Sequence, residues 1–283
     1  MSAMNGPADA AGDSPQHPGH PRAAHGDDRP TAVITGATSG FGAALAHALA
    51  AQGANVVIAG RTAEQAASIA GTIGVERALG VGCDVRRPED LDSLWEAAAG
   101  RFGRIDHWVN NAGIGHPHER LDGLDATRIA AVLATNLTGA LLGSQRALRG
   151  MHQQGGGCIW LTEGLGSNGP LLAGTGVYSA SKAGATRAHR VLAKECRRTG
   201  IRVGFLRPGI MPTRVALGEP GRPVPPTART VERLLGERPE RIARHFAPKI
   251  LTTTRNGRRL TWLTPTRIVR RLAAALRRTS DTR

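Results

Sequence analysis

Short apolar runs alternate with amphipathic stretches along the first two thirds of the chain. Runs of five to seven residues rich in Val, Ile, Leu and Ala predict strands at 31–35, 55–59, 77–83, 105–109, 158–162 and 201–206. Segments with helical periodicity predict helices that end near Gly53 and that cover about 62–71, 88–101, 125–149 and 177–198. Strands that are apolar on both faces are typical of a parallel sheet covered by helices. The pattern therefore predicts an α/β fold with a doubly wound parallel sheet.

The chain is predicted to divide into three parts. Residues 1–29 are rich in Pro, Gly, His, Asp and Ala without apolar periodicity, which indicates a disordered tail. Residues 30–212 hold the predicted Rossmann-type dinucleotide-binding and catalytic core with helices on both faces. The later segments are a proline-rich loop at 213–227, two helical segments at 230–251 and a basic amphipathic helix at 264–278. We expect residues 213–283 to form a helical lobe that covers the substrate.

Positive charge is concentrated in the last third of the chain. The net charge is +15, and from Arg197 onward 21 Lys and Arg face only 5 Asp and Glu. Such a region could attract an anionic substrate, an acidic partner, nucleic acid or a membrane surface. An arginine-rich solvated surface is the interpretation that we favour, because no nucleic-acid motif or aromatic platform accompanies the charge.

Other bulk features point to a cytoplasmic protein. The three cysteines are Cys83, Cys158 and Cys196, and their spacing does not resemble a metal site or a disulfide framework. No run approaches the roughly 18 uncharged apolar residues of a membrane span. The first residues also lack the basic and then apolar pattern of a signal peptide.

A glycine-rich loop follows the first predicted strand. Gly36, Gly40 and Gly42 lie between that strand and a helix. Glycines allow a tight turn and a close approach of the backbone to a pyrophosphate, and the helix N-terminus offers free N–H groups. The alternative is a turn that serves packing alone. The context of strand, loop and helix favours a dinucleotide site.

The end of the second strand bears on the choice of cofactor. NAD-type sites place a carboxylate there for the ribose hydroxyls. This chain has Arg61 at that point, directly after Gly60. A guanidinium can pair with a 2′-phosphate through two hydrogen bonds, so we expect NADP(H) rather than NAD(H). An ordinary surface arginine is the alternative interpretation.

Tyr178 and Lys182 form the strongest chemical signal. Their spacing of four places them one turn apart on one helix face. A phenol with a pKa of about 10 exchanges protons poorly at neutral pH, and a nearby ammonium is expected to lower that pKa. Tyr178 is the only tyrosine of the chain, and packing alone does not explain it in a helix start rich in Ala, Ser and Gly.

Taken together, these motifs resemble the classical short-chain dehydrogenase/reductase family. The resemblance covers residues 30 to about 213 and rests on the segment from Thr35 to Gly42, Asp84, the segment from Asn110 to Gly113, Asn136, Tyr178, Lys182, Pro208 and Gly209. It implies that Asp84 contacts the adenine end, that Asn110 supports the adenosine half, and that Asn136 anchors a water in a proton relay to Lys182. The residues expected at the cofactor are Gly36, Thr38, Ser39, Gly40, Phe41, Gly42, Arg61, Asp84, Val85, Asn110, Ala112, Gly113, Tyr178, Lys182, Pro208, Gly209 and Thr213.

One position departs from the family pattern. The family usually has a serine about thirteen residues before its tyrosine, and this chain has Leu165 there. We choose Ser167, eleven residues before Tyr178, as the group that orients the substrate carbonyl, with Thr162 as the second candidate. A purely structural role of Ser167 in its loop is the alternative. The predicted catalytic set is Asn136, Ser167, Tyr178 and Lys182.

The same loop and the C-terminal region resemble the chlorophyll b reductase branch of this family. The similar segments are 164–167, 237–243, Pro248 and 262–268. The pigment substrate is not carried over from this resemblance. Within these regions Glu163 could tune a pKa or bind a cationic substrate group, or it could face solvent. For Trp160 and Trp262 we expect buried packing, with pocket lining as the alternative.

The expected function is NADP(H)-dependent reduction of a small ketone or aldehyde to an alcohol, or the reverse oxidation, with Tyr178 as acid and base. The alternatives are a non-catalytic NADP-binding sensor or scaffold and nucleic-acid binding through the basic lobe. We expect neither a metal, because no ligand constellation is found, nor a nucleic-acid partner. The resemblance implies a homodimer or homotetramer formed through the helices near 125–149 and 177–198.

Overall fold

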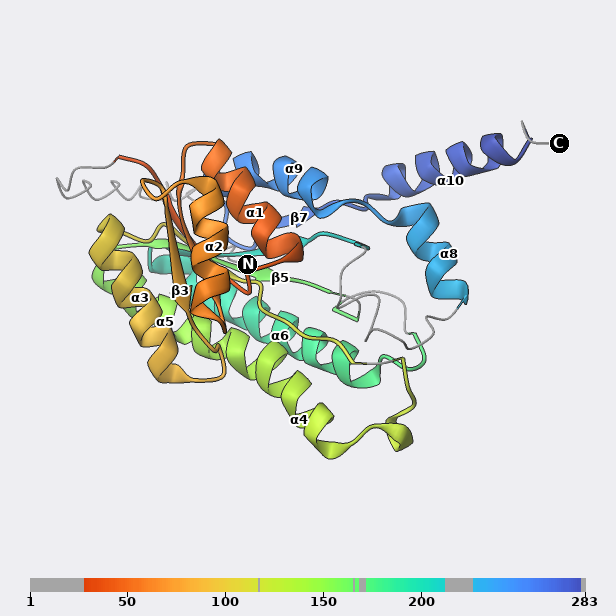
Figure 1. Cartoon of the computed structure of the whole chain (residues 1–283), viewed down its shortest axis with the longest axis horizontal. Helices are drawn as coiled ribbons and strands as arrows, with labels where there is room; N and C mark the ends of the chain where they lie inside the picture. Colours follow the sequence, from red (N-terminus) through yellow and green to blue (C-terminus); the bar gives the residue numbers. More distant parts are fainter. Residues whose placement is uncertain (1–27, 117, 165, 168–171, 212–225, 281–283) are drawn as a thin grey trace, which may run out of the picture.

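A seven-stranded parallel sheet organises the protein (Figure 1). The computed structural model describes residues 28–116, 118–164, 166–167, 172–211 and 226–280. Its strands are β1 (Thr31–Thr35), β2 (Asn55–Gly60), β3 (Ala78–Gly82), β4 (His107–Asn110), β5 (Gly157–Thr162), β6 (Ile201–Arg207) and β7 (Arg259–Thr261). They lie in the order β3-β2-β1-β4-β5-β6-β7, and every neighbouring pair is parallel. The predicted doubly wound α/β fold is confirmed.

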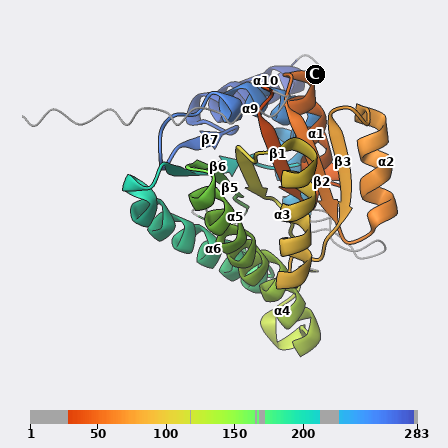
Figure 2. The same ribbon diagram turned by 90° about the vertical axis from the view of Figure 1, so that its left-hand side faces the viewer.

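Helices cover both faces of this sheet (Figure 2). They are α1 (Gly40–Ala51), α2 (Ala63–Ile73), α3 (Pro88–Phe102), α4 (Ala126–Leu133), α5 (Gly139–Gln153), α6 (Gly176–Glu195), α8 (Pro226–Leu235), α9 (Pro239–Leu251) and α10 (Pro265–Ser280). Short helical turns lie at Leu121–Gly123, Ala134–Thr138 and Cys196–Arg198. The helices α1, α2 and α9 lie on one face, and α3, α5 and α6 lie on the other.

Two hydrophobic cores follow from the alternation of side chains along the strands. Val56 and Ile58 of β2 pack toward α1 and α9, whereas Val57 packs on the opposite face. Leu45 and Leu49 of α1 are fully buried in the first core. Each such side chain contributes about 1.5–3 kcal/mol relative to an exposed position. Strands buried on both faces explain the continuous apolar runs of the sequence.

The direction of winding reverses between β1 and β4. From β1 the chain proceeds outward to β2 and β3, and then returns to β4 on the other side of β1. Loops at the carboxyl ends of β1 and β4 therefore diverge and leave a crevice, which is where doubly wound folds bind ligands. The loops after Thr35 and Asn110, which carry the predicted motifs, meet at this point.

Part of the C-terminal region extends the sheet. Strand β7 pairs with β6, and α9 packs on α1, where the rings of Phe41 and Phe246 lie 6.2 Å apart edge to face. The sequence did not predict β7, because three residues carry no readable periodicity. The two predicted helical segments are α8 and α9, and α10 projects from the body toward the C-terminus (Figure 1).

The helix predicted at 125–149 is longer and interrupted. It consists of α4, a π-helical turn at Ala134–Thr138 and α5, which ends at Gln153. By length and mean hydropathy alone, the stretch Ala126–Gln153 could cross a membrane. In the fold this stretch contacts α3, α6 and the sheet, and 28% of its apolar window is buried.

Candidate active site

The glycine loop between β1 and α1 forms a cradle of bare backbone. Gly36 and Gly40 have positive φ angles of 62° and 56°, a conformation that side chains with a Cβ rarely adopt. A Cβ at Gly42 would lie 2.5 Å from the carbonyl oxygen of Gly36. Ser39 precedes α1 but makes no side-chain cap. Thr38 lies in the same loop, and Phe41 lies in the first turn of α1. The first N–H groups of a helix have no partner within the helix, so this N-terminus can present them to a pyrophosphate.

Asn111 joins this loop to the loop after β4. Its amide Nδ2 donates hydrogen bonds to the carbonyl oxygens of Thr35 at 3.0 Å and Gly36 at 3.1 Å. The hydroxyl of Thr35 in turn accepts from the backbone N–H groups of Asn111 and Ala112. The sequence predicts a role for Asn110, the last residue of β4, and gives none to Asn111, which directly follows it.

The structure places the side chain of Asn110 away from this crevice. Its Oδ1 accepts from the indole N–H of Trp108 at 3.0 Å, and its Nδ2 donates to the hydroxyl of Ser144 on α5 at 2.8 Å. Asn110 is 4% exposed. Its side chain therefore ties β4 to α5, and the adjacent Asn111 links the two cofactor-side loops.

The predicted adenosine end gathers at the ends of β2 and β3. Arg61 directly follows Gly60, and it is exposed. The ion pair with Arg86, together with the more distant charge of Arg61, lowers the pKa of Asp84, although partial burial opposes this. Val85 is buried beside them. Arg61 and Asp84 are thus close enough to interact, as a shared ribose-adenine site requires.

Asn136 lies in the π-helical turn between α4 and α5. Its Oδ1 accepts from the backbone N–H of Ile114 at 2.8 Å, and its Nδ2 donates to the carbonyl oxygen of Ile114 and to the hydroxyl of Ser181. A Cβ at Gly113 would lie 3.3 Å from Asn136 Oδ1 and 3.4 Å from Lys182 Nζ. Turns of this kind occur often at functional sites, and this one brings Asn136 beside Lys182.

Tyr178 and Lys182 lie one turn apart on α6. The ammonium group of Lys182 lies 6.0 Å from the centroid of the Tyr178 ring and donates a hydrogen bond to the carbonyl oxygen of Thr162 at 3.2 Å. Burial lowers the pKa of Lys182 to about 8, and the negative charge of Glu163 partly opposes this change. Both predicted residues therefore meet at the carboxyl end of β5.

Burial raises the pKa of Tyr178 to about 12. Sequence reasoning expected the opposite direction, on the ground that the Lys182 ammonium would stabilise the phenolate. In this structure the ammonium is directed to the carbonyl oxygen of Thr162, so the desolvation of the phenol dominates. The phenol is consequently protonated at neutral pH in the protein without a bound nucleotide.

Two unpredicted residues contact Tyr178. A Cβ at Gly164 would lie 2.4 Å from the phenolic oxygen, so only glycine permits the observed approach. The backbone N–H of Tyr178 donates to Nε2 of the buried His116 at 3.2 Å. Gly164 comes shortly after β5, and His116 comes shortly after the segment 110–113. These positions were the available sequence signals for a site role, because both loops meet at the carboxyl edge of the sheet.

Glu163 forms a buried ionic cluster behind the lysine. Its carboxylate is fully buried and accepts from Arg207 at 2.9 Å and from Arg259 at 3.0 and 3.1 Å. The interpretation as a solvent-facing loop carboxylate is therefore wrong. Its field acts on Lys182 and raises that pKa against the effect of burial.

Both candidate substrate-orienting hydroxyls are bonded within the protein. Ser167 Oγ accepts from the backbone N–H of Gly164 at 3.1 Å and donates to the carbonyl oxygen of Lys182 at 3.5 Å. Thr162 Oγ1 donates to Asn111 Oδ1 at 3.3 Å. Ser167 therefore supports the Gly164 backbone beside Tyr178, and Thr162 faces the cofactor-side loops.

The last predicted cofactor residues follow β6. Pro208 is buried, and Gly209 has a φ angle of 81°. A Cβ at Gly209 would lie 2.8 Å from the side chain of Leu263, which follows β7. Thr213 lies outside the described residues. Within the described part of the chain, no three His, Cys, Asp or Glu residues gather as a metal site.

Comparisons with known proteins agree with this geometry. The sequence profile described as "short chain dehydrogenase" matches residues 30–219. A probable chlorophyll(ide) b reductase of rice is 33% identical over 263 residues, which cover 86% of this chain and 51% of that protein. The chain thus spans about half the length of this chloroplast relative and of its Arabidopsis counterpart. The predicted resemblance to this branch is confirmed.

A second relative and a solved structure cover more of their own lengths. The cis-4-hydroxycyclohexanecarboxylate dehydrogenase of Sinomonas cyclohexanicum is 38% identical over 221 residues, covering 76% of this chain and 87% of that protein. The crystal structure of a 3-ketoacyl-(acyl-carrier-protein) reductase from Brucella melitensis complexed with NADH superimposes with a TM-score of 0.73 at 29% identity. The superposition covers 82% of this chain and 96% of the Brucella reductase chain. The glycine cradle, the pair Tyr178 and Lys182, and these matches together show that the chain belongs to the short-chain dehydrogenase/reductase family of oxidoreductases.

Proposed function

We propose that the protein is an NADPH-dependent reductase of a ketone or aldehyde, able to catalyse the reverse alcohol oxidation, with Tyr178 as acid and base. The observation that carries this proposal is the convergence of Tyr178 and Lys182 beside Gly164 at the carboxyl end of β5. The glycine cradle after β1 and Gly113 lie at the same edge of the sheet. A dinucleotide and a carbonyl group can therefore meet at this phenol.

Tyr178 and Lys182 have different roles in the proposed proton transfer. In the reductive direction the Tyr178 phenol, which is protonated at neutral pH, donates its proton to the developing alkoxide oxygen. The Lys182 ammonium stabilises the phenolate that remains. A bound nicotinamide supplies the hydride to the carbonyl carbon. In the oxidative direction the positive charges of Lys182 and of a bound oxidised nicotinamide would lower the pKa of Tyr178, and the resulting phenolate would accept the proton from the alcohol.

The preference for NADPH rests on Arg61. This exposed guanidinium follows β2 at the place where NAD-type sites carry a carboxylate. It can form two hydrogen bonds with a 2′-phosphate. Similar solved structures carry NADH in one case and NADP or NADPH in others, so the preference of this chain is argued from Arg61.

Cofactor titration tests the proposal. Nicotinamide fluorescence is followed with NADPH and NADH for the unmodified protein, Arg61→Ala and the exposed control Arg198→Ala. We expect NADPH to bind more tightly, and Arg61→Ala to weaken it about ten- to a hundredfold, as the loss of about 1.5–3 kcal/mol implies. The control should change neither affinity. If neither nucleotide binds, the oxidoreductase proposal fails.

A carbonyl screen then separates catalysis from binding alone. Cyclic ketones are the first probes, because one relative carries a cyclic secondary alcohol in its name. Turnover that Tyr178→Phe abolishes supports the reductase. Tight NADPH binding without turnover of any carbonyl would instead support a non-catalytic nucleotide sensor or scaffold.

Assembly and location remain proposals as well. Leu141 on α5 and Val191 on α6 are 41% and 46% exposed. Contact between these helices of two subunits would bury both side chains and give the expected homodimer or homotetramer, which light scattering would detect. The cytoplasmic location is likewise proposed, and fluorescence microscopy of the tagged full chain would test it.

A further inference from the structure

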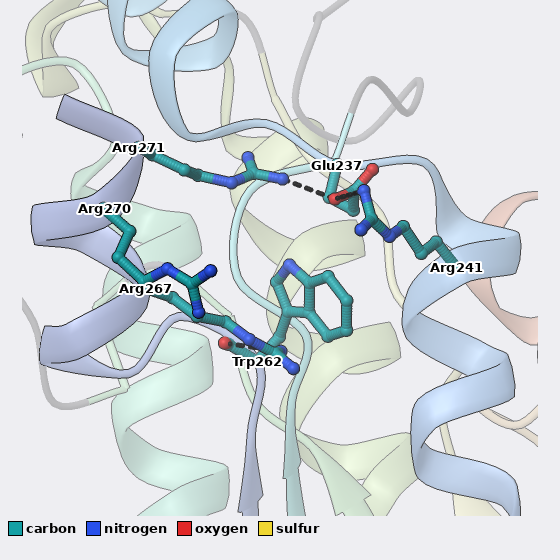
Figure 3. Close-up of a pocket in the computed structure, with 6 residues that line it drawn as sticks. All are labelled: Glu237, Arg241, Trp262, Arg267, Arg270 and Arg271. Carbon is teal, nitrogen blue, oxygen red and sulfur yellow. Dashed lines mark hydrogen bonds and ion pairs between the residues drawn. The ribbon is translucent and has the colours of Figure 1, made fainter. Parts of the chain in front are cut away.

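An open pocket of about 340 Å³ lies at the end of β7, between α9 and α10 (Figure 3). The residues that line it are Glu237, Arg241, Trp262, Arg267, Arg270 and Arg271. The lining thus contains four guanidinium groups and one carboxylate. The Glu237 carboxylate accepts from Arg241 at 3.2 Å and also from Arg271. Arg267 and Arg270 add two further positive charges, so the pocket attracts an anion.

Trp262 supplies a buried donor to the same pocket. Its side chain is 5% exposed, and among the described residues its indole Nε1 has no hydrogen-bond partner. Figure 3 shows the nitrogen side of the ring turned toward the space between Arg270, Arg271 and Glu237. A buried donor without an acceptor costs about 1–3 kcal/mol. A bound anion would provide the acceptor that the indole N–H lacks.

The positions of the arginine and the indole are fixed before any ligand binds. The guanidinium carbon of Arg267 lies 3.8 Å from the Trp262 ring centroid, and its Nη1 donates to the carbonyl oxygen of Trp262 at 3.1 Å. Arg271 Nη1 donates to the carbonyl oxygen of Gly236 at 2.6 Å. Such preorganisation lowers the entropic cost of binding.

The positive field also acts on neighbouring groups. Burial, the charge of Lys249 and the charge of Arg267 lower the pKa of His245, whose ring lies 5.3 Å from that of Trp262. Burial and the charges of Arg267 and Arg258 similarly lower the pKa of Lys249. The positive charges around the pocket therefore reinforce the effect of burial on both groups.

Backbone hydrogen bonds place the pocket beside the proposed nicotinamide end of the active site. The N–H of Trp262 donates to the carbonyl oxygen of Arg207 at 3.0 Å, and the N–H of Glu237 donates to that of Ile210 at 3.0 Å. These two acceptors flank Pro208 and Gly209, which the family resemblance assigns to the cofactor. A molecule whose carbonyl group lies at Tyr178 could therefore extend toward the arginines.

We propose that this pocket binds the carboxylate or phosphate group of the substrate, so that the enzyme acts on acidic carbonyl compounds. The substrate assignment rests on the proposed reductase function, whereas the anion site itself does not. A planar guanidinium pairs with either group through two hydrogen bonds, and the Trp262 N–H adds a directional third donor. Diffuse surface charge alone would not require a buried indole donor.

Indole NMR tests the site directly, because the chain has four tryptophans, Trp95, Trp108, Trp160 and Trp262. The Nε1–H signals of the NADPH-saturated full chain are followed during titration with cyclohexanecarboxylate, with inorganic phosphate and with uncharged cyclohexylmethanol. We expect a saturable shift of the Trp262 signal with at least one anion and none with the alcohol. The two anion titrations show whether a carboxylate or a phosphate is preferred.

Two matched variants establish that the shift comes from the pocket. Arg270→Gln removes an exposed arginine that lines it, and Arg255→Gln removes the same charge from an exposed position outside it. We expect Arg270→Gln to weaken the anion about tenfold and Arg255→Gln to leave it unchanged. An unmoved Trp262 signal, or equal effects of both variants, would overturn the proposal. A Trp262 shift caused by NADPH alone that abolishes the anion response would also overturn it.

Kinetics separates this proposal from the proposed function. Reduction of 4-oxocyclohexanecarboxylate is compared with reduction of 4-methylcyclohexanone in the same variants. We expect the acid to have the higher kcat/KM, and Arg270→Gln to reduce that preference about tenfold. Reduction of both ketones without preference would refute the acidic substrate and leave the reductase intact. An anion-dependent Trp262 shift without any reduction would support the anion site and count against the reductase.

Discussion

Arg259, on the last strand of the sheet, binds the carboxylate of Glu163 through two nitrogens, although 96 residues separate them in the chain. Glu163 is fully buried, and Arg207 is its second partner. The cluster links β7 to β6 beside Lys182, on which the Glu163 charge acts. A buried carboxylate depends on such partners, because leaving it unpaired is costly.

Removal of Arg259 is expected to destabilise the fold. We expect Arg259→Met to lower the free energy of unfolding by about 1–3 kcal/mol, less than for an isolated buried pair because Arg207 remains bound. Urea denaturation measures the change. The exposed control Arg255→Met should stay within about 0.5 kcal/mol of the unmodified protein. Equal values for the two variants would contradict the assigned role.

Glu163 should set the pKa of Lys182. Because the carboxylate opposes the effect of burial, Glu163→Gln is expected to lower the pKa of Lys182 below its present value of about 8. The chain has three lysines, Lys182, Lys194 and Lys249, so ¹³Cε NMR of labelled lysine resolves each titration. An unchanged Lys182 midpoint in the variant would show that Glu163 does not act on it.

Stability should depend on pH through the same lysine. The folded protein releases the Lys182 proton near pH 8, whereas the unfolded chain holds it to about 10.5. The unfolded state then binds more protons within this window, so the free energy of unfolding contributed by Lys182 rises with pH from about 8 to 10.5. Urea denaturation of the unmodified protein and Lys182→Met across this window should differ in slope. Parallel slopes would contradict the lowered pKa.

The single tyrosine permits a direct test of its ionisation. Because burial raises the pKa of Tyr178 to about 12, tyrosinate absorbance should be absent at pH values near 10, where an ordinary phenol is half ionised. Unfolded protein in urea provides the reference. A midpoint at or below 10 in the folded, nucleotide-free protein would contradict the dominant effect of burial on the phenol.

Gly164 should tolerate no side chain. A Cβ there would lie 2.4 Å from the Tyr178 phenolic oxygen, so Gly164→Ala is expected to displace the phenol and lower kcat at least about tenfold. The matched control is Gly176→Ala at the start of α6, where a Cβ would meet nothing within 4 Å. Steady-state kinetics compares the two. Similar kcat values would refute the steric argument.

Loss of the Ser167 hydroxyl and loss of the Thr162 hydroxyl should affect different kinetic parameters. Ser167 supports the Gly164 backbone, so Ser167→Ala is expected to lower kcat more than it raises the KM for the nucleotide. Thr162 donates to Asn111 on the cofactor side, so Thr162→Val should mainly raise that KM. The reverse pattern would assign the substrate-orienting role to Thr162.

Much of the fold could be predicted because its signals are local. Buried parallel strands are apolar along their whole length, and the helices between them show their own periodicity. The glycine loop and the pair Tyr178 and Lys182 were also readable, since a turn of special backbone geometry and a helical spacing of four depend only on neighbouring residues. The sequence predicted a doubly wound sheet, and the structure supplied the order of its strands.

Long-range contacts explain what the sequence did not reveal. Nothing local distinguishes Asn110, which binds Ser144 in the core, from Asn111, which joins two loops. The pKa of Tyr178 depended on how deeply the ring is buried and on where Lys182 points.

The parallel sheet, the glycine loop and the candidate pair Tyr178 and Lys182 were predictable from the sequence, because their signals lie in residues that are close along the chain. Contacts between distant segments bury Glu163 with Arg207 and Arg259, add β7 to the sheet, and bring arginines from α9 and α10 to the indole of Trp262. The number of charges in a sequence does not show which charged side chains lie close together. Packing decides this, because it determines which charged groups are buried together and away from water.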